Sequence, residues 1–167
     1  MSTRSVLAWA AALSMASMRA CDVLLPALST EFGVSIGEAG WSISTFVLAY
    51  GLLQLVYGPL GDRFGVQRVI AVALAASAMA NILAAVAPTM GALVLARGLS
   101  GAAAAGIVPL CMANIGDTVP IGRRQQALAR LALATISGLA LGQWMSGCVA
   151  QVLHWRVVFA VLAAGFG

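Results

Sequence analysis

The chain has 167 residues, of which 62% are hydrophobic and only 8% are charged, and its formal net charge is +4. Soluble domains carry about 25% charged residues, so this composition excludes a soluble enzyme and a disordered chain. All nine basic residues are arginines scattered along the chain, which excludes a nucleic-acid binder.

Long apolar segments predict an all-α membrane protein. A spanning helix needs about 20 apolar residues, and continuous Ala-, Leu- and Gly-rich runs exclude the alternating strands of a membrane barrel. Five spans are expected at about 5–28, 40–59, 69–87, 91–115 and 127–152, and a partial sixth at 157–167. We therefore expect residues 1–167 to form one N-terminal transmembrane bundle that is truncated within its sixth span, with the C-terminal bundle absent.

The first apolar segment begins like a secretory signal, with Arg4 before an apolar run. The run continues past Ala20 without a clear cleavage site, and further apolar segments follow it. We interpret it as a retained first span.

The three cysteines lie far apart in apolar runs and show no C-x-x-C spacing; they are Cys21, Cys111 and Cys148. This pattern is typical of buried small side chains, so we expect no disulfide and no metal site. No stretch of the sequence indicates a cofactor.

The charges between the spans predict an orientation. Arginines gather on the side of the N-terminus, at Arg4, Arg63, Arg68, Arg123, Arg124 and Arg130. The opposite loops carry Glu31, Glu38, His154 and Arg156. Because positive charge collects on the cytoplasmic side, we expect a multi-pass protein of the plasma (inner) membrane with a cytoplasmic N-terminus.

The loop after the second span reads GPLGDRFGVQR, and it is the most informative stretch of the chain. Asp62 stands at a helix end, where it could accept hydrogen bonds from a neighbouring helix N-terminus and oppose its dipole. Arg63 and Arg68 can pair with carboxylates or lipid phosphates, and Gly65 allows a tight turn.

This loop resembles the motif G-x-L-A-D-R-x-G-R-R/K of the major facilitator superfamily. The matching residues are Gly58, Leu60, Asp62, Arg63 and Gly65, and the departures are Gly61, Val66 and Gln67, with Arg68 following directly. The resemblance implies a transporter fold and a cytoplasmic gate that is centred on Asp62.

The fourth span contains Arg97, and a charge inside an apolar span is a functional hypothesis by default. The stretch LVLARGLSGAAAAG resembles a second pattern of the same family, at Leu93, Arg97, Gly101, Ala104 and Ala105, with Ser100 in place of a common Gln. The resemblance implies a role for Arg97 in proton coupling. The alternative is an arginine near the helix end that snorkels to the membrane surface.

The first span contains Arg19 and Asp22, which are three residues apart and therefore share a helix face. The stretch that begins at Asp22 resembles the D-x-x-L-P-A-L of Bcr/CflA-type drug:proton antiporters, twelve-span members of the family. The resemblance implies that Asp22 lines a central cavity and binds protons or cationic substrates. The alternative is a self-neutralising pair with Arg19. We expect Pro26 to bend the helix near this site.

Several further residues are assigned to packing or to the cavity. Gly101, Gly138, Gly142 and Gly147 are expected to allow close helix approach, and the last three partly resemble the fifth-span glycines of drug antiporters. Tyr50, Gln54 and Tyr57 either line a cavity or make polar contacts between helices. His154 and Trp155 are read as residues at the membrane interface, with Trp155 as an anchor.

The sequence therefore predicts a fragment of a secondary active transporter, which exports small amphipathic compounds or drugs in exchange for protons by alternating access. Its expected partners are the substrate, protons, the lipid bilayer and the missing C-terminal bundle. The alternatives are a proton-coupled metabolite importer and a truncated, non-transporting membrane protein, and we expect residues 1–167 alone not to transport. An intramembrane protease that uses Ser100 and His154 is a weaker alternative, because the two residues are predicted at opposite membrane faces.

Overall fold

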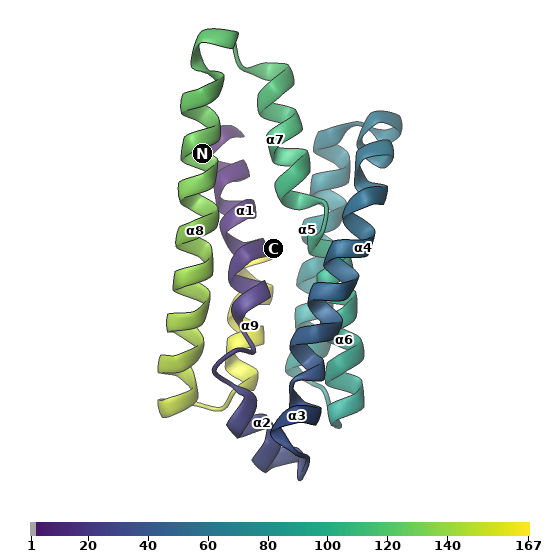
Figure 1. The fold of residues 1–167 in the computed structure, drawn as a ribbon, viewed down its shortest axis with the longest axis vertical. Coiled ribbons are helices and arrows are strands. Elements are labelled where there is room, and N and C mark those ends of the chain that lie inside the picture. The colour runs from purple at the N-terminus through teal and green to yellow at the C-terminus, as the bar shows by residue number, and fades with distance from the viewer. Residues whose placement is uncertain (1–2) are drawn as a thin grey trace.

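The computed structural model describes residues 3–167, without the side chains of residues 3, 4 and 150, so the side chain of Arg4 lies outside the described part. Within this range the chain is helical and contains no strand (Figure 1). The helices are α1 (Thr3–Arg19), α2 (Leu25–Phe32), α3 (Ile36–Ala39), α4 (Trp41–Phe64), α5 (Val66–Ala85), α6 (Met90–Ala104), α7 (Ile107–Thr118), α8 (Ile121–Val152) and α9 (Arg156–Phe166).

Within the described residues 3–167, four helical segments are long and apolar enough to cross a membrane, by length and composition. They are Ile36–Phe64, Val66–Ala85, Met90–Thr118 and Ile121–Val149. The apolar helix α9 is shorter, and the first expected span is divided between α1 and α2. The positions at which the segments enter a membrane, and the division into bundles, stay predictions.

The first expected span is broken at residues 20–24, between α1 and α2. Pro26 explains the break, because proline has no N–H and its ring clashes with the carbonyl four residues earlier, here that of Asp22. Proline is tolerated in the first turn of α2, which begins at Leu25. Asp22 therefore lies in a turn, and the expectation that it shares a continuous helix face with Arg19 is wrong.

A second break separates α6 from α7 at residues 105–106. Pro109 stands four residues after Ala105 and disrupts the helix in the same way. The Tyr57 ring packs against Gly106, where a Cβ would lie 2.0 Å from a ring carbon. Only glycine fits this contact without a shift of the tyrosine.

Hydroxyl groups satisfy the backbone carbonyls at this second break. Tyr57 Oη donates to the carbonyls of Ala102 and Ala103, at 3.1 Å each. Ser14 Oγ donates to the carbonyl of Ala104 at 3.3 Å. Side chains from α4 and α1 thus replace part of the hydrogen bonding that the helix loses, as a break inside an apolar bundle requires.

Helix α1 packs against α8, α4 packs against α6, and α5 packs against both α6 and α9 (Figure 1). Glycines permit the closest approaches: a Cβ at Gly138 would lie 2.2 Å from the Ala12 carbonyl oxygen, and one at Gly101 would lie 2.2 Å from that of Phe46. A Cβ at Gly142 would lie 2.5 Å from Ala16 backbone atoms. At Gly147 the nearest atom, on Val23, would be 4.0 Å away, which is ordinary contact.

The connection from α2 to α4 is fixed by local caps. Gly33 ends α2 with a positive φ of 63°. The Ser35 hydroxyl then accepts a hydrogen bond from the Glu38 N–H, and the Glu38 carboxylate accepts one from the Ser35 N–H. This reciprocal capping box engages Glu38 within its own short helix α3.

Candidate functional site

Arg97 lies at the centre of the bundle and is fully buried. Its guanidinium carbon is 4.2 Å from the Phe46 ring centroid and 5.8 Å from that of Phe159. Its Nε, Nη1 and Nη2 atoms have no hydrogen-bond partner among the residues that the structure describes. The alternative that Arg97 snorkels to the surface is therefore wrong, and two aromatic faces lie against its charge.

Asp22 forms an ion pair with Arg19, and Arg19 Nη1 lies 2.7 Å from Asp22 Oδ2. The Arg19 side chain is 51% exposed, whereas that of Asp22 is 16% exposed. Cys21 and Asp22 also interact electrostatically with Arg97, and the Cys21 side chain adds a weak hydrogen-bonding contact. Asp22 thus has one bonded, exposed cation and one buried, unbonded cation as neighbours.

A buried polar network joins three helices around the same region. Asn81 of α5 donates from Nδ2 to Ser100 Oγ at 3.1 Å and to the Ser77 carbonyl at 2.8 Å. Ser17 Oγ of α1 donates to Asn81 Oδ1 at 3.5 Å. Ser100 stands three residues after Arg97 on α6, so the network adjoins the arginine. Our sequence analysis missed Asn81, although an amide inside an apolar span was a signal for it.

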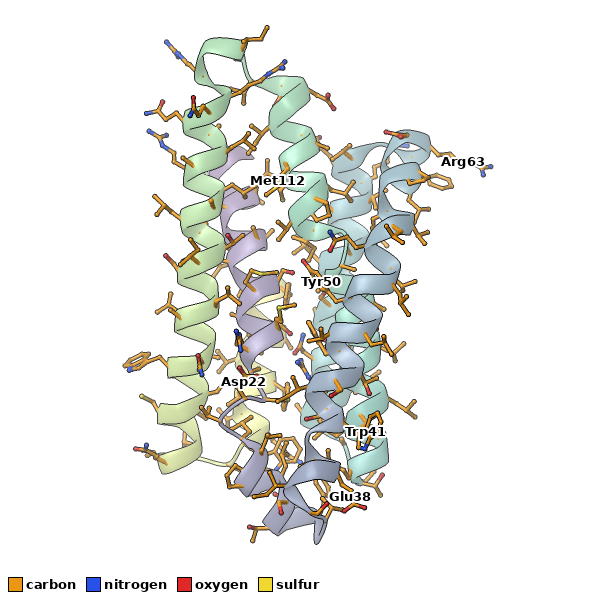
Figure 2. The ribbon with its side chains drawn as sticks, in the orientation of Figure 1. Asp22, Glu38, Trp41, Tyr50, Arg63 and Met112 are labelled. Carbon is orange, nitrogen blue, oxygen red and sulfur yellow. The ribbon has the colours of Figure 1, made fainter. Side chains whose placement is uncertain are left out.

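The residues expected along the second span have different environments. Tyr50 is buried and stacks on Phe46, with ring centroids 6.1 Å apart. Gln54 is exposed, and Tyr57 makes the helix–helix contact at the second break. Figure 2 shows Asp22 and Tyr50 between the two ends of the bundle, and Glu38 and Arg63 at opposite ends.

Asp62 lies in the last turn of α4, and the chain turns directly after that helix at Gly65, whose φ of +89° favours glycine. Asp62 is exposed and makes no hydrogen bond or ion pair with any described residue. The guanidinium of Arg63 lies 5.3 Å from the Phe64 ring centroid. A Cβ at Gly61 would lie 2.7 Å from a Leu110 methyl carbon of α7. This close packing explains why the chain has a glycine where the family motif has a larger residue.

The opposite end of the bundle carries a cluster around Glu31. Its Oε1 accepts from Arg156 Nη1 at 2.9 Å, and its Oε2 lies 3.0 Å from His154 Nε2 and accepts from Trp155 Nε1. Trp155 is only 3% exposed, so its assignment as an interfacial anchor is wrong. The sequence analysis treated these residues separately and missed the cluster.

The protease alternative has no geometric support, because Ser100 and His154 have different partners, Asn81 and Glu31. Among the residues that the structure describes, no group of three or more His, Cys, Asp or Glu side chains could hold a metal ion. What the centre of the bundle offers is a carboxylate in a helix break beside a buried, unbonded cation.

Comparison with known proteins identifies the family. The profile described as Major Facilitator Superfamily matches residues 7–167. The chain is 34% identical over 137 residues to the puromycin resistance protein pur8 of Streptomyces alboniger, which covers 81% of this chain and 27% of that protein. It is 32% identical over 138 residues to the multidrug efflux pump LfrA of Mycolicibacterium smegmatis, with coverages of 82% and 27%.

The chain therefore spans about a quarter of the length of these curated relatives. A crystal structure of a D-xylose-proton symporter superposes with a TM-score of 0.84 at 16% sequence identity, over 98% of this chain and 45% of the symporter. At this identity the likeness shows the fold alone, and it confirms the predicted all-α bundle of a major facilitator fold. Because the family profile matches nearly the whole chain, the chain belongs to the major facilitator superfamily.

Proposed function

We propose that the protein is a secondary active transporter that exports small amphipathic compounds in exchange for protons, and that this chain supplies its N-terminal bundle. Several relatives are named for resistance or efflux, including pur8, LfrA and the multidrug export protein EmrB of Haemophilus influenzae. Membership of a family of transporters also favours a transporter over an enzyme.

The observation that carries this proposal is the buried, unbonded Arg97 next to the helix break that holds Asp22. A charge in an apolar interior without a partner is expensive and is typical of a functional site. Asp22 can keep its pair with Arg19, change to Arg97, or take up a proton and release both. Proton uptake at Asp22 would therefore change the charge at the centre of the bundle, as coupled transport requires.

Further residues take supporting roles. Tyr50 and Gln54 would form part of the substrate path from α4. The exposed Asp62, with Arg63 and Arg68, would form the cytoplasmic gate at the junction of α4 and α5. The gate role is supported by the exposure of Asp62, whose carboxylate pairs with no described residue and can bind a partner elsewhere in the protein.

We infer that the end of the bundle with Arg63 faces the cytoplasm of a bacterial-type inner membrane. At that end Arg63 lies in the last turn of α4, Arg68 in the first turn of α5, and Arg123 and Arg124 in the first turn of α8, whereas Arg156 lies at the opposite end with Glu31. A second bundle would complete the cavity, since alternating access rocks one bundle against another. An intact mass well above 17.0 kDa in the native membrane would support this requirement. A mass of 17.0 kDa would instead require self-assembly of the chain.

The test is the accumulation of a fluorescent cationic drug in cells that express the protein, with and without a protonophore. Wild-type cells should accumulate less drug, and the protonophore should abolish the difference. Asp22→Asn should accumulate drug as empty cells do, because the substituted side chain binds no proton. Glu38→Gln is the matched control, since Glu38 bonds only to Ser35. Equal efflux by wild type and Asp22→Asn would contradict the role of Asp22, and uptake that needs a proton gradient would indicate an importer.

A further inference from the structure

We propose that Glu31, His154 and Arg156 form a latch, which fastens the half-helix α2 to the start of α9 and thereby keeps the break at Cys21–Asp22 closed. The latch lies at the end of the bundle where α2, α3 and α9 meet (Figure 1). It does not depend on the transport activity proposed above, although its use in a transport cycle rests on that proposed function.

The latch joins three separate parts of the chain through polar contacts. Glu31 of α2 accepts from Arg156 and Trp155 and lies against His154, all at the start of α9. Arg156 also donates from Nη2 to the Ala87 carbonyl, just after α5, at 2.9 Å. One carboxylate thus has three donors, two of which can be cationic, and such charge-assisted contacts are the stronger ones.

The charged and titratable groups around Glu31 come from the start of α9. From α9 it meets His154 and Arg156, and from the chain after α5 only the Ala87 carbonyl reaches the cluster. From α3, Glu38 is engaged by its own cap at Ser35. The charge of the latch therefore depends on Glu31, on His154 and on the permanently charged Arg156.

Apolar packing connects the latch to the centre of the bundle. Trp155 contacts Phe32 of α2 at 5.8 Å and Phe159 at 5.9 Å between ring centroids. Phe159 in turn lies under the guanidinium of Arg97. Cys21 and Leu28 belong to the same buried cluster as Trp155. A movement of α2 away from α9 would open this cluster at Cys21, beside Asp22.

The three native cysteines provide the test. Cys21 is buried at the break, Cys148 is exposed, and Cys111 is buried in the other core cluster. The membrane-embedded protein is treated with a maleimide, and the modification of each cysteine peptide is followed by mass spectrometry. Cys148 serves as the exposed reference thiol for the reagent, and Cys111 reports global unfolding.

At a fixed pH, His154→Gln should raise the ratio of the Cys21 rate to the Cys148 rate above the wild-type ratio, because it removes one of the contacts to Glu31. Glu31→Gln should increase the Cys21 rate about tenfold at the same pH, which corresponds to a loss of about 1.4 kcal/mol from a contact to a charged group. Glu38→Gln should leave the rate unchanged.

The proposal is overturned by a Cys21 rate that stays at the wild-type level in Glu31→Gln, or that rises equally in Glu38→Gln. A rise at Cys111 in parallel would mean unfolding of that variant, and His154→Gln then decides: a ratio of Cys21 to Cys148 rates at the wild-type level overturns the latch. Because maleimide labelling needs no transport, a failure of the latch is distinguishable from a failure of the transport proposal.

Discussion

Arg97 has a position that packing alone does not explain. Its guanidinium is buried between Phe46 and Phe159, and its nitrogen atoms bind none of the described residues. An apolar side chain of similar length would fill the same space without the cost of a desolvated charge. Because a buried charge at this position reduces the stability of the fold, we expect Arg97 to serve the function of the protein. Its replacement should therefore raise or keep the stability and lower the transport activity.

Arg97→Met should therefore keep or raise stability and abolish drug efflux. Replacing buried ionic groups with apolar residues of similar volume is neutral or stabilising by about 1–4 kcal/mol. Thermal unfolding of the detergent-solubilised protein measures the first effect, and drug accumulation measures the second. A clear loss of stability would show that Arg97 has a structural partner, and unchanged efflux would remove it from the transport mechanism.

Glycines at helix contacts are the second feature at the residue scale. Gly101→Ala would place a methyl group 2.2 Å from the Phe46 carbonyl oxygen, so α4 and α6 must separate. We expect a loss of about 1–3 kcal/mol, the usual effect of overpacking. Gly58→Ala is the matched control, because its Cβ would have open space, and it should gain up to about 1 kcal/mol from helix propensity. Equal melting temperatures for the two variants would show that the α4–α6 contact is adaptable.

At the scale of elements, the two broken helices place polar groups inside an apolar bundle. The first break brings Asp22 near Arg97, and the second ends α6 at Ala104. In each break a proline stands four residues after the carbonyl that it displaces, at Pro26 and Pro109. Hydroxyl groups from neighbouring helices occupy the carbonyls of the second break.

Tyr57→Phe tests the second break. The variant keeps the ring against Gly106 but leaves the Ala102 and Ala103 carbonyls without their donor, at an expected cost of about 1–3 kcal/mol. Amide exchange of residues 104–108 should accelerate in step with this loss. Tyr50→Phe is the comparison, because the Tyr50 hydroxyl reaches the break only indirectly, through Ser14, and it should change exchange there less than Tyr57→Phe does. Identical exchange in both variants would show that the carbonyls do not need the tyrosine.

The sequence was sufficient to predict the all-α fold, because uninterrupted apolar runs leave few alternatives for a backbone in lipid. Pro26 indicated a bend near Asp22, but the extent of the break depends on how α2 packs against α9. The Glu31 cluster was beyond sequence reasoning, because its partners lie 123 to 125 residues away along the chain and the fold alone brings them together. Sequence separation also explains why the Arg19–Asp22 pair, whose residues are three positions apart, was easier to predict than the surroundings of Arg97, which come from distant parts of the chain.

At the scale of the whole molecule, the two ends of the bundle differ in chemistry. The end with Arg63, labelled in Figure 2, carries exposed charges that make few contacts. At the opposite end, Glu31 joins α2 to the start of α9 through a network of charged contacts. A mobile gate needs unengaged groups, and a latch needs engaged ones. The proposed gate and the proposed latch therefore lie at opposite ends of the bundle and would act on opposite faces of a membrane.

This arrangement predicts the sidedness of two glycine positions. In a background with Cys148→Ser, Gly37→Cys lies near the latch and Gly122→Cys near the arginines at the start of α8, and neither new side chain would clash with a neighbour. Since arginine-rich loops stay in the cytoplasm, a membrane-impermeant maleimide added to intact cells should label Gly37→Cys but not Gly122→Cys. Permeabilised cells should show labelling of both. The reverse pattern in intact cells would invert the orientation, and it would place Asp62 on the outer face, where a cytoplasmic gate is impossible.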